Sequence, residues 1–140
     1  MNRSVLAKYI ICSLVSLMVF GGMMGVSGAS ANSHDPVDAL LELLAGNDRF
    51  SSGQSTHPNL SAERRELVTS GGQHPFATVI ACSDSRVPVE MLFDQGVGDI
   101  FVIKVAGNVC NTDEIGSIEY GVDHLDTPVM VVLGHTHCGA

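Results

Sequence analysis

The sequence predicts an α/β domain built on a parallel sheet. From about residue 35 onward, short apolar runs suited to buried strands alternate with segments of helical periodicity. Two of the three expected strands run directly into clusters of Cys, His, Asp and Arg, at the strand ends where open parallel sheets gather ligands. The 140 residues leave room for one domain, and a hydrophobic content of 45% is typical of a globular chain.

Residues 1–31 are predicted to be a secretory signal peptide. Arg3 and Lys8 precede an apolar stretch, and Ala29-Ser30-Ala31 supplies the small residues that signal peptidase reads. A membrane anchor is the alternative, but serines and a glycine pair interrupt the apolar stretch and no basic flank follows it. We therefore expect cleavage after Ala31 and export to the periplasm or the medium. The mature domain, residues 32–140, is then not expected to associate stably with a membrane.

Two helices are expected before the first strand. Asp35 suits the cap and Pro36 the first position of a helix that fades near Gly46 or Phe50. A polar loop follows, and then a second, charged helix over about 61–70. The apolar residues of the first helix fall on one face, as on an amphipathic helix: Val37, Leu40, Leu41 and Leu44.

Three strands and two further helices are expected in the remainder of the chain. The strands are short runs rich in Val and Ile, which suits buried parallel strands. They are expected over 76–82, 99–105 and 128–133, with helices over 88–94 and 112–125 between them. The longer helix aligns Ile115, Ile118, Val122 and Leu125.

Charge and cysteine content exclude some classes of protein. Fifteen Asp and Glu against seven Lys and Arg give a net charge of −8, and no run of basic residues exists, so nucleic acid is not an expected partner. Three cysteines lie beyond residue 31, and an odd number does not indicate a disulfide framework. The absence of Cys-x-x-Cys disfavours a thiol redox protein. A metal site using some of these thiols is favoured, with Cys110 expected to be a spare buried thiol.

Cys82, His135 and Cys138 are the predicted zinc ligands. Cys82 leaves one strand, whereas His135 and Cys138, three residues apart, leave another. Thiolate and imidazole suit zinc, which prefers four tetrahedral ligands, and three protein ligands leave the fourth position for water as in catalytic sites. Buried structural thiols are the alternative interpretation.

Asp84 and Arg86 follow Cys82 at alternate positions. The planar guanidinium of Arg86 can hold the carboxylate of Asp84. Beside a metal, Asp84 can accept a hydrogen bond from a bound water or become a fourth ligand in a closed state. The alternative is an ordinary surface ion pair, which is worth little energetically.

Four motifs in this order resemble those of the β-class carbonic anhydrases: Cys-Ser-Asp-Ser-Arg (82–86), Phe-Asp-Gln-Gly-Val-Gly-Asp-Ile-Phe-Val (93–102), Ala-Gly-Asn (106–108) and Gly-His-Thr-His-Cys-Gly-Ala (134–140). The resemblance implies a parallel-centred sheet flanked by helices, bound Zn²⁺, and reversible hydration of carbon dioxide to bicarbonate and a proton. It also implies a homodimer or dimer-based oligomer, with N-terminal helices wrapping a partner and sites at the interface. Family members continue well past the last motif, so the chain is expected to lack the C-terminal part of the domain.

The same resemblance implies roles for single residues. Cys82, His135 and Cys138 correspond to the zinc ligands, and Asp84 with Arg86 to the pair that orients the attacking hydroxide. Three positions correspond to substrate-binding or substrate-lining residues: Gln73, Phe101 and Gly139. His74 and His137 are candidates for proton transfer, with solvated or packing histidines as the alternative. Two alternatives for function stay open: a related zinc enzyme acting on carbonyl sulfide or carbon disulfide, and a non-catalytic zinc-binding domain closed by four protein ligands.

Overall fold

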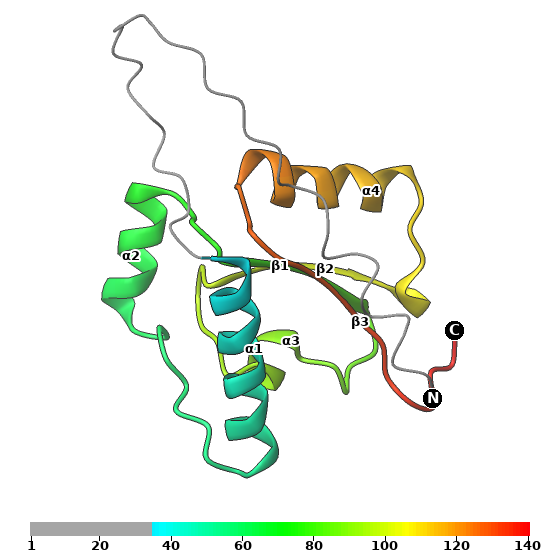
Figure 1. Ribbon diagram of the computed structural model, residues 1–140, viewed down its shortest axis with the longest axis horizontal. Coiled ribbons are helices and arrows are strands. Elements are labelled where there is room, and N and C mark those ends of the chain that lie inside the picture. The colour runs from blue at the N-terminus through cyan, green and yellow to red at the C-terminus, as the bar shows by residue number, and fades with distance from the viewer. Residues whose placement is uncertain (1–34) are drawn as a thin grey trace, which may run out of the picture.

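The computed structural model describes residues 35–140, in which a parallel sheet carries helices on both faces (Figure 1). Its strands are β1 (Ala77–Cys82), β2 (Ile100–Val105) and β3 (Met130–Leu133). Their order is β2-β1-β3, and β1 pairs in parallel with both neighbours. The predicted α/β class with a parallel sheet is confirmed. The predicted signal peptide and its cleavage site lie outside the described residues.

The helices lie where the sequence predicts them, two before the first strand and two between strands. They are α1 (Pro36–Ser51), α2 (Ala62–Gly71), α3 (Val89–Leu92) and α4 (Thr112–Glu119). Figure 1 shows α4 on one face of the sheet and α1 with α3 on the other. Asp35 caps α1 as expected, because its Oδ1 accepts a hydrogen bond from the Val37 N–H at 2.8 Å. At α4, Asn111 and Glu114 form a reciprocal capping box.

The helix expected over 112–125 changes its winding partway. It is α-helical to Glu119 and continues as a π-helical turn over Tyr120–His124. The carbonyl of Gly121 accepts from the N–H of Thr127 at 3.2 Å and from its hydroxyl at 3.0 Å. The Leu125 N–H instead reaches back five residues to the Tyr120 carbonyl at 3.0 Å, which gives the wider turn.

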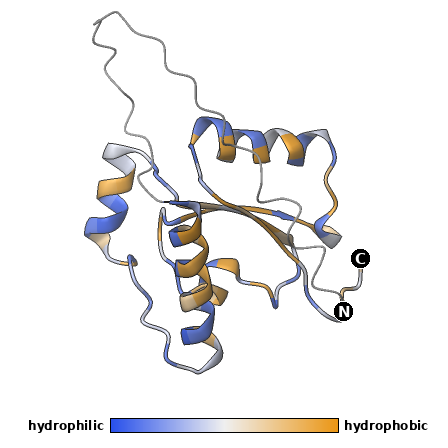
Figure 2. Cartoon of the chain, viewed as in Figure 1, coloured by the Kyte–Doolittle hydropathy of each residue, from blue (hydrophilic) through white to orange (hydrophobic). Residues whose placement is uncertain are grey.

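The hydrophobic core is centred on β1, all six residues of which are buried. Ala39 and Leu43 of α1 and Val89 of α3 pack on one side of it. In Figure 2 the strands are coloured as hydrophobic while the outward helix turns are mixed. At the edge of the sheet β3 is only partly covered, and Val132 is 65% exposed. Side chains on β3 can therefore be exposed to solvent although the neighbouring strand, β1, is fully buried.

The apolar face that the sequence predicts for α1 is not the one that packs inward. All four of its residues are exposed: Val37, Leu40, Leu41 and Leu44. The buried positions are Ala39, Leu43 and Gly46. Gly46 lies so close to the backbone carbonyl of Phe93 that any Cβ there would clash with it. Close approach of the two backbones selects the face with small residues, and leaves the leucine-rich face uncovered.

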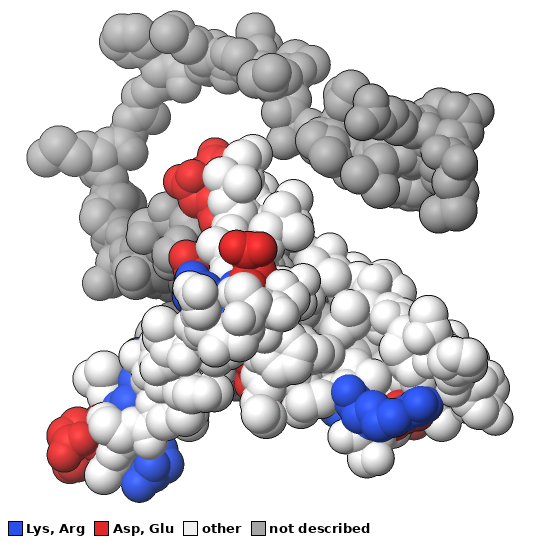
Figure 3. Space-filling model, turned by 90° about the horizontal axis from the view of Figure 1, so that it is seen from below, with Lys and Arg blue, Asp and Glu red and all other residues white. Residues whose placement is uncertain are grey.

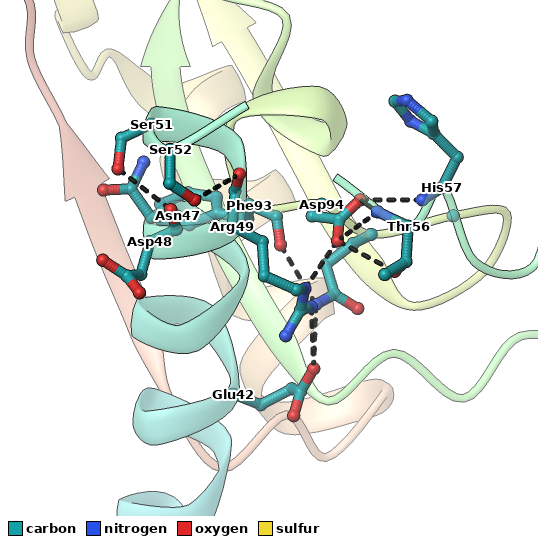
Figure 4. A network of polar contacts seen from close by, with 12 residues as sticks. Glu42, Asn47, Asp48, Arg49, Ser51, Ser52, Thr56, His57, Phe93 and Asp94 are labelled. Carbon is teal, nitrogen blue, oxygen red and sulfur yellow. Dashed lines mark hydrogen bonds and ion pairs between the residues drawn. The ribbon is translucent and has the colours of Figure 1, made fainter. Parts of the chain in front are cut away.

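A buried carboxylate joins α1 to the segment after α3 (Figure 4). Asp94 is 1% exposed and accepts hydrogen bonds from Arg49 Nε at 2.6 Å and the His57 N–H at 2.9 Å. The N–H and the hydroxyl of Thr56 add bonds of 3.0 Å. The Thr56 N–H and the Arg49 guanidinium hold the pKa of Asp94 well below its usual range, despite burial. The network fixes the loop after α1 against the segment that follows α3.

The surface of the described part carries scattered charge. Figure 3 shows Lys and Arg side chains interspersed with Asp and Glu, without a continuous basic patch on this face. Within residues 35–140, none of the helices has the length and apolar content needed to cross a bilayer.

Candidate metal centre

The three predicted zinc ligands come together at the carboxyl edge of the sheet. Cys82 ends β1, while His135 and Cys138 follow β3, and the carboxyl ends of adjacent parallel strands meet at one edge. Their candidate ligand atoms all lie within 4.8 Å of one another. The sulfur atoms of Cys82 and Cys138 are 3.8 Å apart. Cys82 is buried, His135 half-buried and Cys138 exposed, so the cluster opens to solvent on the β3 side.

The hydrogen bonding of His135 fits a metal ligand. Its Nδ1 lies 3.0 Å from the Thr136 carbonyl, and donation to that oxygen leaves Nε2 as the lone-pair atom. Nε2 is buried and has no hydrogen-bond partner among the described residues. A buried polar atom without a partner is costly, and a metal ion between this nitrogen and the two sulfurs would satisfy it. The donor set of two thiols and one imidazole fits Zn²⁺.

The surroundings of Cys82 favour its thiolate form. The Gly107 N–H lies 3.3 Å from the Cys82 sulfur. The backbone N–H groups of Asp84 and Gly107, together with the His135 ring, lower the pKa of the Cys82 thiol to about 7. The same sulfur in turn raises the pKa of His135. Since the thiolate is the metal-binding form, the lowered pKa reduces the free energy needed to deprotonate Cys82 when a metal binds.

Asp84 and Arg86 form a two-armed ion pair beside the cluster. Arg86 Nε and Nη2 donate to the two carboxylate oxygens of Asp84 at 2.9 and 2.8 Å. Nη2 also donates to the His137 carbonyl at 3.0 Å, which links the pair to the loop that carries the other ligands. Asp84 Oδ2 lies 3.8 Å from His135 Nε2. The guanidinium holds the pKa of Asp84 well below its usual range, so this carboxylate is charged and oriented next to the candidate metal position.

Of the three predicted substrate residues, Gly139 lies beside the cluster, whereas Gln73 and Phe101 do not lie near it in the same chain. Gln73 is exposed and precedes β1, so it lies near the amino ends of the strands, whereas Cys82 lies at the carboxyl end of β1. Phe101 pairs in register with Thr78 near the amino ends of the strands, and its ring packs 5.8 Å from that of Tyr120. Gly139 adjoins Cys138, with open space around it.

The remaining candidates lie apart from one another. His137 is exposed and contributes its backbone carbonyl to Arg86, whereas His74 lines a pocket beside α2 with a volume of about 350 Å³. Cys110 is exposed in the described part of the chain, so the expectation of a buried thiol is wrong. It lies in the segment between β2 and α4, outside the core that surrounds β1.

The contribution of the turn after β2 to the site was not predicted from the sequence. The turn after β2, Ala106–Asn108, supplies the Gly107 N–H to the Cys82 sulfur. It also supplies the Asn108 side-chain amide, which donates to the Leu133 carbonyl at 2.6 Å. The Gly107-Asn108 pair could have indicated this contribution. It follows the carboxyl end of β2, and the other two strands of the sheet end at the cluster.

Fold and site together define an α/β protein in which a Cys-His-Cys cluster that could hold a metal ion lies at the carboxyl edge of a parallel sheet. Residues 77–140 match the family model described as carbonic anhydrase. The carbonic anhydrase of Mycolicibacterium smegmatis is 51% identical over 106 residues, which are 76% of this chain and 51% of that protein. The resemblance to β-class carbonic anhydrases is therefore confirmed, and the chain is a relative of these proteins.

Solved structures agree with this relationship. The structure of the β-carbonic anhydrase CcaA matches with a TM-score of 0.52 and 35% identity, over 71% of this chain and 50% of that one. A tetrameric β-carbonic anhydrase from the ascomycete Sordaria macrospora matches with a TM-score of 0.51 and 28% identity, over 73% of this chain and 51% of that one. The chain spans about half the length of the curated mycobacterial relatives that it matches.

Proposed function

We propose that this protein is a zinc-dependent carbonic anhydrase that interconverts carbon dioxide and bicarbonate, with release of a proton. The observation that carries the proposal is the Cys82–His135–Cys138 cluster, with an arginine-held carboxylate beside it. The sheet that carries these residues belongs to a fold that the chain shares with a β-carbonic anhydrase of 35% identity. Three protein ligands leave one tetrahedral position for solvent, as catalytic zinc sites require.

The chemistry divides between the ion and the side chains next to it. Zinc, when bound, lowers the pKa of a coordinated water to about 7 and so makes a hydroxide nucleophile available at neutral pH. Asp84 would accept a hydrogen bond from this hydroxide and so orient the lone pair of the hydroxide towards the carbon of carbon dioxide. Arg86 fixes Asp84 through two bonds, so that the carboxylate is oriented before substrate arrives. His135 and the two thiolates supply the ligands.

The position of Asp84 bears on the closed state, in which it would become a fourth ligand. Its Oδ2 is close to His135 Nε2, at 3.8 Å, but both carboxylate oxygens are engaged by Arg86. As long as this ion pair persists, Asp84 is held towards Arg86, and a bound ion would keep its fourth position for solvent. The pair therefore supports a catalytic site over a structural zinc site with four protein ligands.

We also propose a dimer-based assembly and export from the cytoplasm. The leucine-rich face of α1 is exposed, which suits burial against a second copy, and one similar structure is described as tetrameric. Gln73 lies at the sheet edge away from the cluster of its own chain, so its action on substrate would take place at the site of a second copy. Export rests on the basic, apolar and small-residue pattern of residues 1–31.

Metal content and hydration rate, measured on the same preparation of the complete protein, test the proposed activity. We expect about one zinc per chain and hydration of carbon dioxide by stopped flow, both lost in Cys82→Ala. Carbonyl sulfide and carbon disulfide, assayed in parallel, separate the related substrates. Zinc-loaded protein that hydrates none of the three would reject the enzyme and favour a structural zinc domain. Full zinc content in Cys82→Ala would show that the metal binds elsewhere.

A further inference from the structure

The end of β2 reaches both segments that carry the metal cluster, although β2 supplies no ligand. In the sheet it lies beside β1 and on the far side from β3. After Val105 the chain turns through Gly107 and Asn108, whose φ angles of 71° and 56° are both left-handed. This turn brings the chain along the carboxyl edge of the sheet, past the end of β1 and as far as the end of β3.

Two contacts of the turn point at the two halves of the cluster. The Gly107 N–H donates to the Cys82 sulfur at 3.3 Å. One residue further on, Asn108 Nδ2 donates to the Leu133 carbonyl at 2.6 Å. Leu133 is the last residue of β3 and precedes His135 by two positions. The turn thus spans from the ligand on β1 to the strand that carries the other two ligands.

We infer that Asn108 is a positioning residue that sets the distance between Cys82 and the ligand pair His135 and Cys138. This inference rests on the proposed zinc site. The end of β3 is at the edge of the described sheet, where Val132 is 65% exposed and β1 is the neighbouring strand. The Asn108 amide restrains this end of β3 from the other side of β1. A tetrahedral ion tolerates little error in ligand placement, so loss of this bond should weaken metal binding more than it weakens the fold.

Two properties of Asn108 serve this role. Its left-handed backbone suits Asn and Gly better than other residues, and its side chain supplies the donor that Leu133 receives. Asn108→Gly therefore keeps the backbone conformation accessible and removes only the donor. Partners outside the first ligand shell typically contribute roughly 10- to 100-fold to metal affinity.

The chain offers a matched control in Asn59. Its φ of 55° is also left-handed, and its Nδ2 also donates, to the carboxylate of Asp99 at 2.9 Å. Asp99 directly precedes β2, so this bond lies at the opposite edge of the sheet from the cluster. Asn59→Gly removes the same amide from the same backbone conformation and should lower thermal stability without changing metal affinity.

The test is zinc affinity of the complete protein, measured by competition with a chromogenic chelator, with circular dichroism and the unfolding temperature recorded alongside. We expect Asn108→Gly to bind zinc about tenfold more weakly or worse, and Asn59→Gly to bind like wild type. Equal zinc affinity in wild type and Asn108→Gly would overturn the inference and leave the proposed function intact. Equal weakening in both variants, or an Asn108→Gly protein that does not fold while Asn59→Gly does, would assign Asn108 to the fold and also overturn it. Wild-type protein that binds no zinc would reject the proposed function and the inference together.

Discussion

At the scale of single residues, the pair of Asp84 and Arg86 controls what the carboxylate can reach. Arg86 occupies both oxygens of Asp84, and 3.8 Å separates Oδ2 from His135 Nε2. In Arg86→Ala the two guanidinium bonds are lost. The backbone N–H of residue 86, which donates to Asp84 Oδ1 at 2.9 Å, does not hold Oδ2 away from a bound ion. We expect zinc content to be retained and the hydration rate to fall by about 100-fold, as misplaced groups at reacting centres do.

Hydration rate and zinc content of folded Arg86→Ala provide this measurement. Asp84→Asn is the companion variant: it should also retain zinc and lose rate, because an amide can donate to the nucleophile instead of only accepting from it. A folded, zinc-loaded Arg86→Ala with the wild-type rate would contradict the role given to the pair, although not the metal site.

Zinc affinity should fall on acidification below about pH 7. The pKa of the Cys82 thiol in the metal-free protein is lowered to about 7, and protons compete with zinc for the thiolate. Above this pH the Cys82 sulfur is mostly ionised and protons no longer compete for it, although His135, whose pKa is raised, must still give up its second proton to bind an ion. Below the pKa, the apparent zinc affinity should fall about tenfold for each pH unit and for each proton that zinc must displace. Chelator competition from about pH 5.5 to about pH 8.5 measures the profile.

Cys110→Ser is the control for this profile, because Cys110 is an exposed thiol outside the cluster. The variant should reproduce the wild-type pH dependence. A zinc affinity that stays constant between about pH 8 and about pH 6 would show that the Cys82 sulfur is not a ligand.

The convergence of the cluster could be predicted from sequence, because parallel strands align their carboxyl ends and Cys82 and His135 each follow one. The geometry at Asn108 could not. A left-handed turn that reaches past one strand to another depends on strand order, and three strands can be ordered in several ways. The exposure of Cys110 was also hidden, because a short segment between a strand and a helix carries no periodicity.

At the scale of elements, α1 packs on the core through a face that differs from the leucine-rich face that its sequence predicts. Leu43 is 1% exposed in the core, whereas Leu44, the next residue, is 56% exposed. Leu43→Ala should lower the free energy of unfolding by about 2–5 kcal/mol. Leu44→Ala should change it by no more than about 0.5 kcal/mol in the isolated chain. Urea unfolding of both variants provides the measurement, and equal losses would contradict the packing of α1.

Acid should weaken the attachment of α1 through Asp94. The folded pKa of this carboxyl is held below its unfolded value of about 3.9, so its contribution to stability is full above that pH and is lost as pH falls below it. Asp94→Asn should be less stable at neutral pH and should lose part of the acid sensitivity. Urea unfolding between about pH 7 and about pH 3 tests this. Asp123→Asn, at an exposed carboxylate, is the control and should keep the wild-type slope.

The order and type of the elements were predictable because local signals agree with the fold. Buried strands read as apolar runs, and Asp35 with Pro36 marks the start of α1. The inward face of α1 was not predictable, because an apolar stripe does not say which neighbour covers it. The approach to the Phe93 backbone at Gly46 decides the packing, and that contact lies 47 residues away along the chain. The π-helical turn likewise depends on Thr127 bonding to the Gly121 carbonyl.

At the scale of the whole molecule, the uncovered face of α1 predicts self-association. Leu41, at 55% exposure, lies on this face. Analytical ultracentrifugation of wild-type protein should give a dimer or a larger species, and Leu41→Glu should shift it towards monomer by placing a charge in the interface. Leu60→Glu, at a similarly exposed leucine in the loop before α2, should leave the assembly unchanged. A wild-type protein that stays monomeric at high concentration would contradict the proposed assembly.

The arrangement of the strands also fixes when the metal can bind during folding. Cys82 and Cys138 are 56 residues apart in the chain, and they meet only after the connection through α4 has formed and β3 has paired with β1. Closing so long a loop is a slow, late event compared with helix formation or the local turn after α1. Zinc therefore cannot serve as an early nucleus for this chain, and its uptake marks the end of sheet assembly. The time course of metal incorporation during refolding should consequently follow the slowest phase of strand pairing.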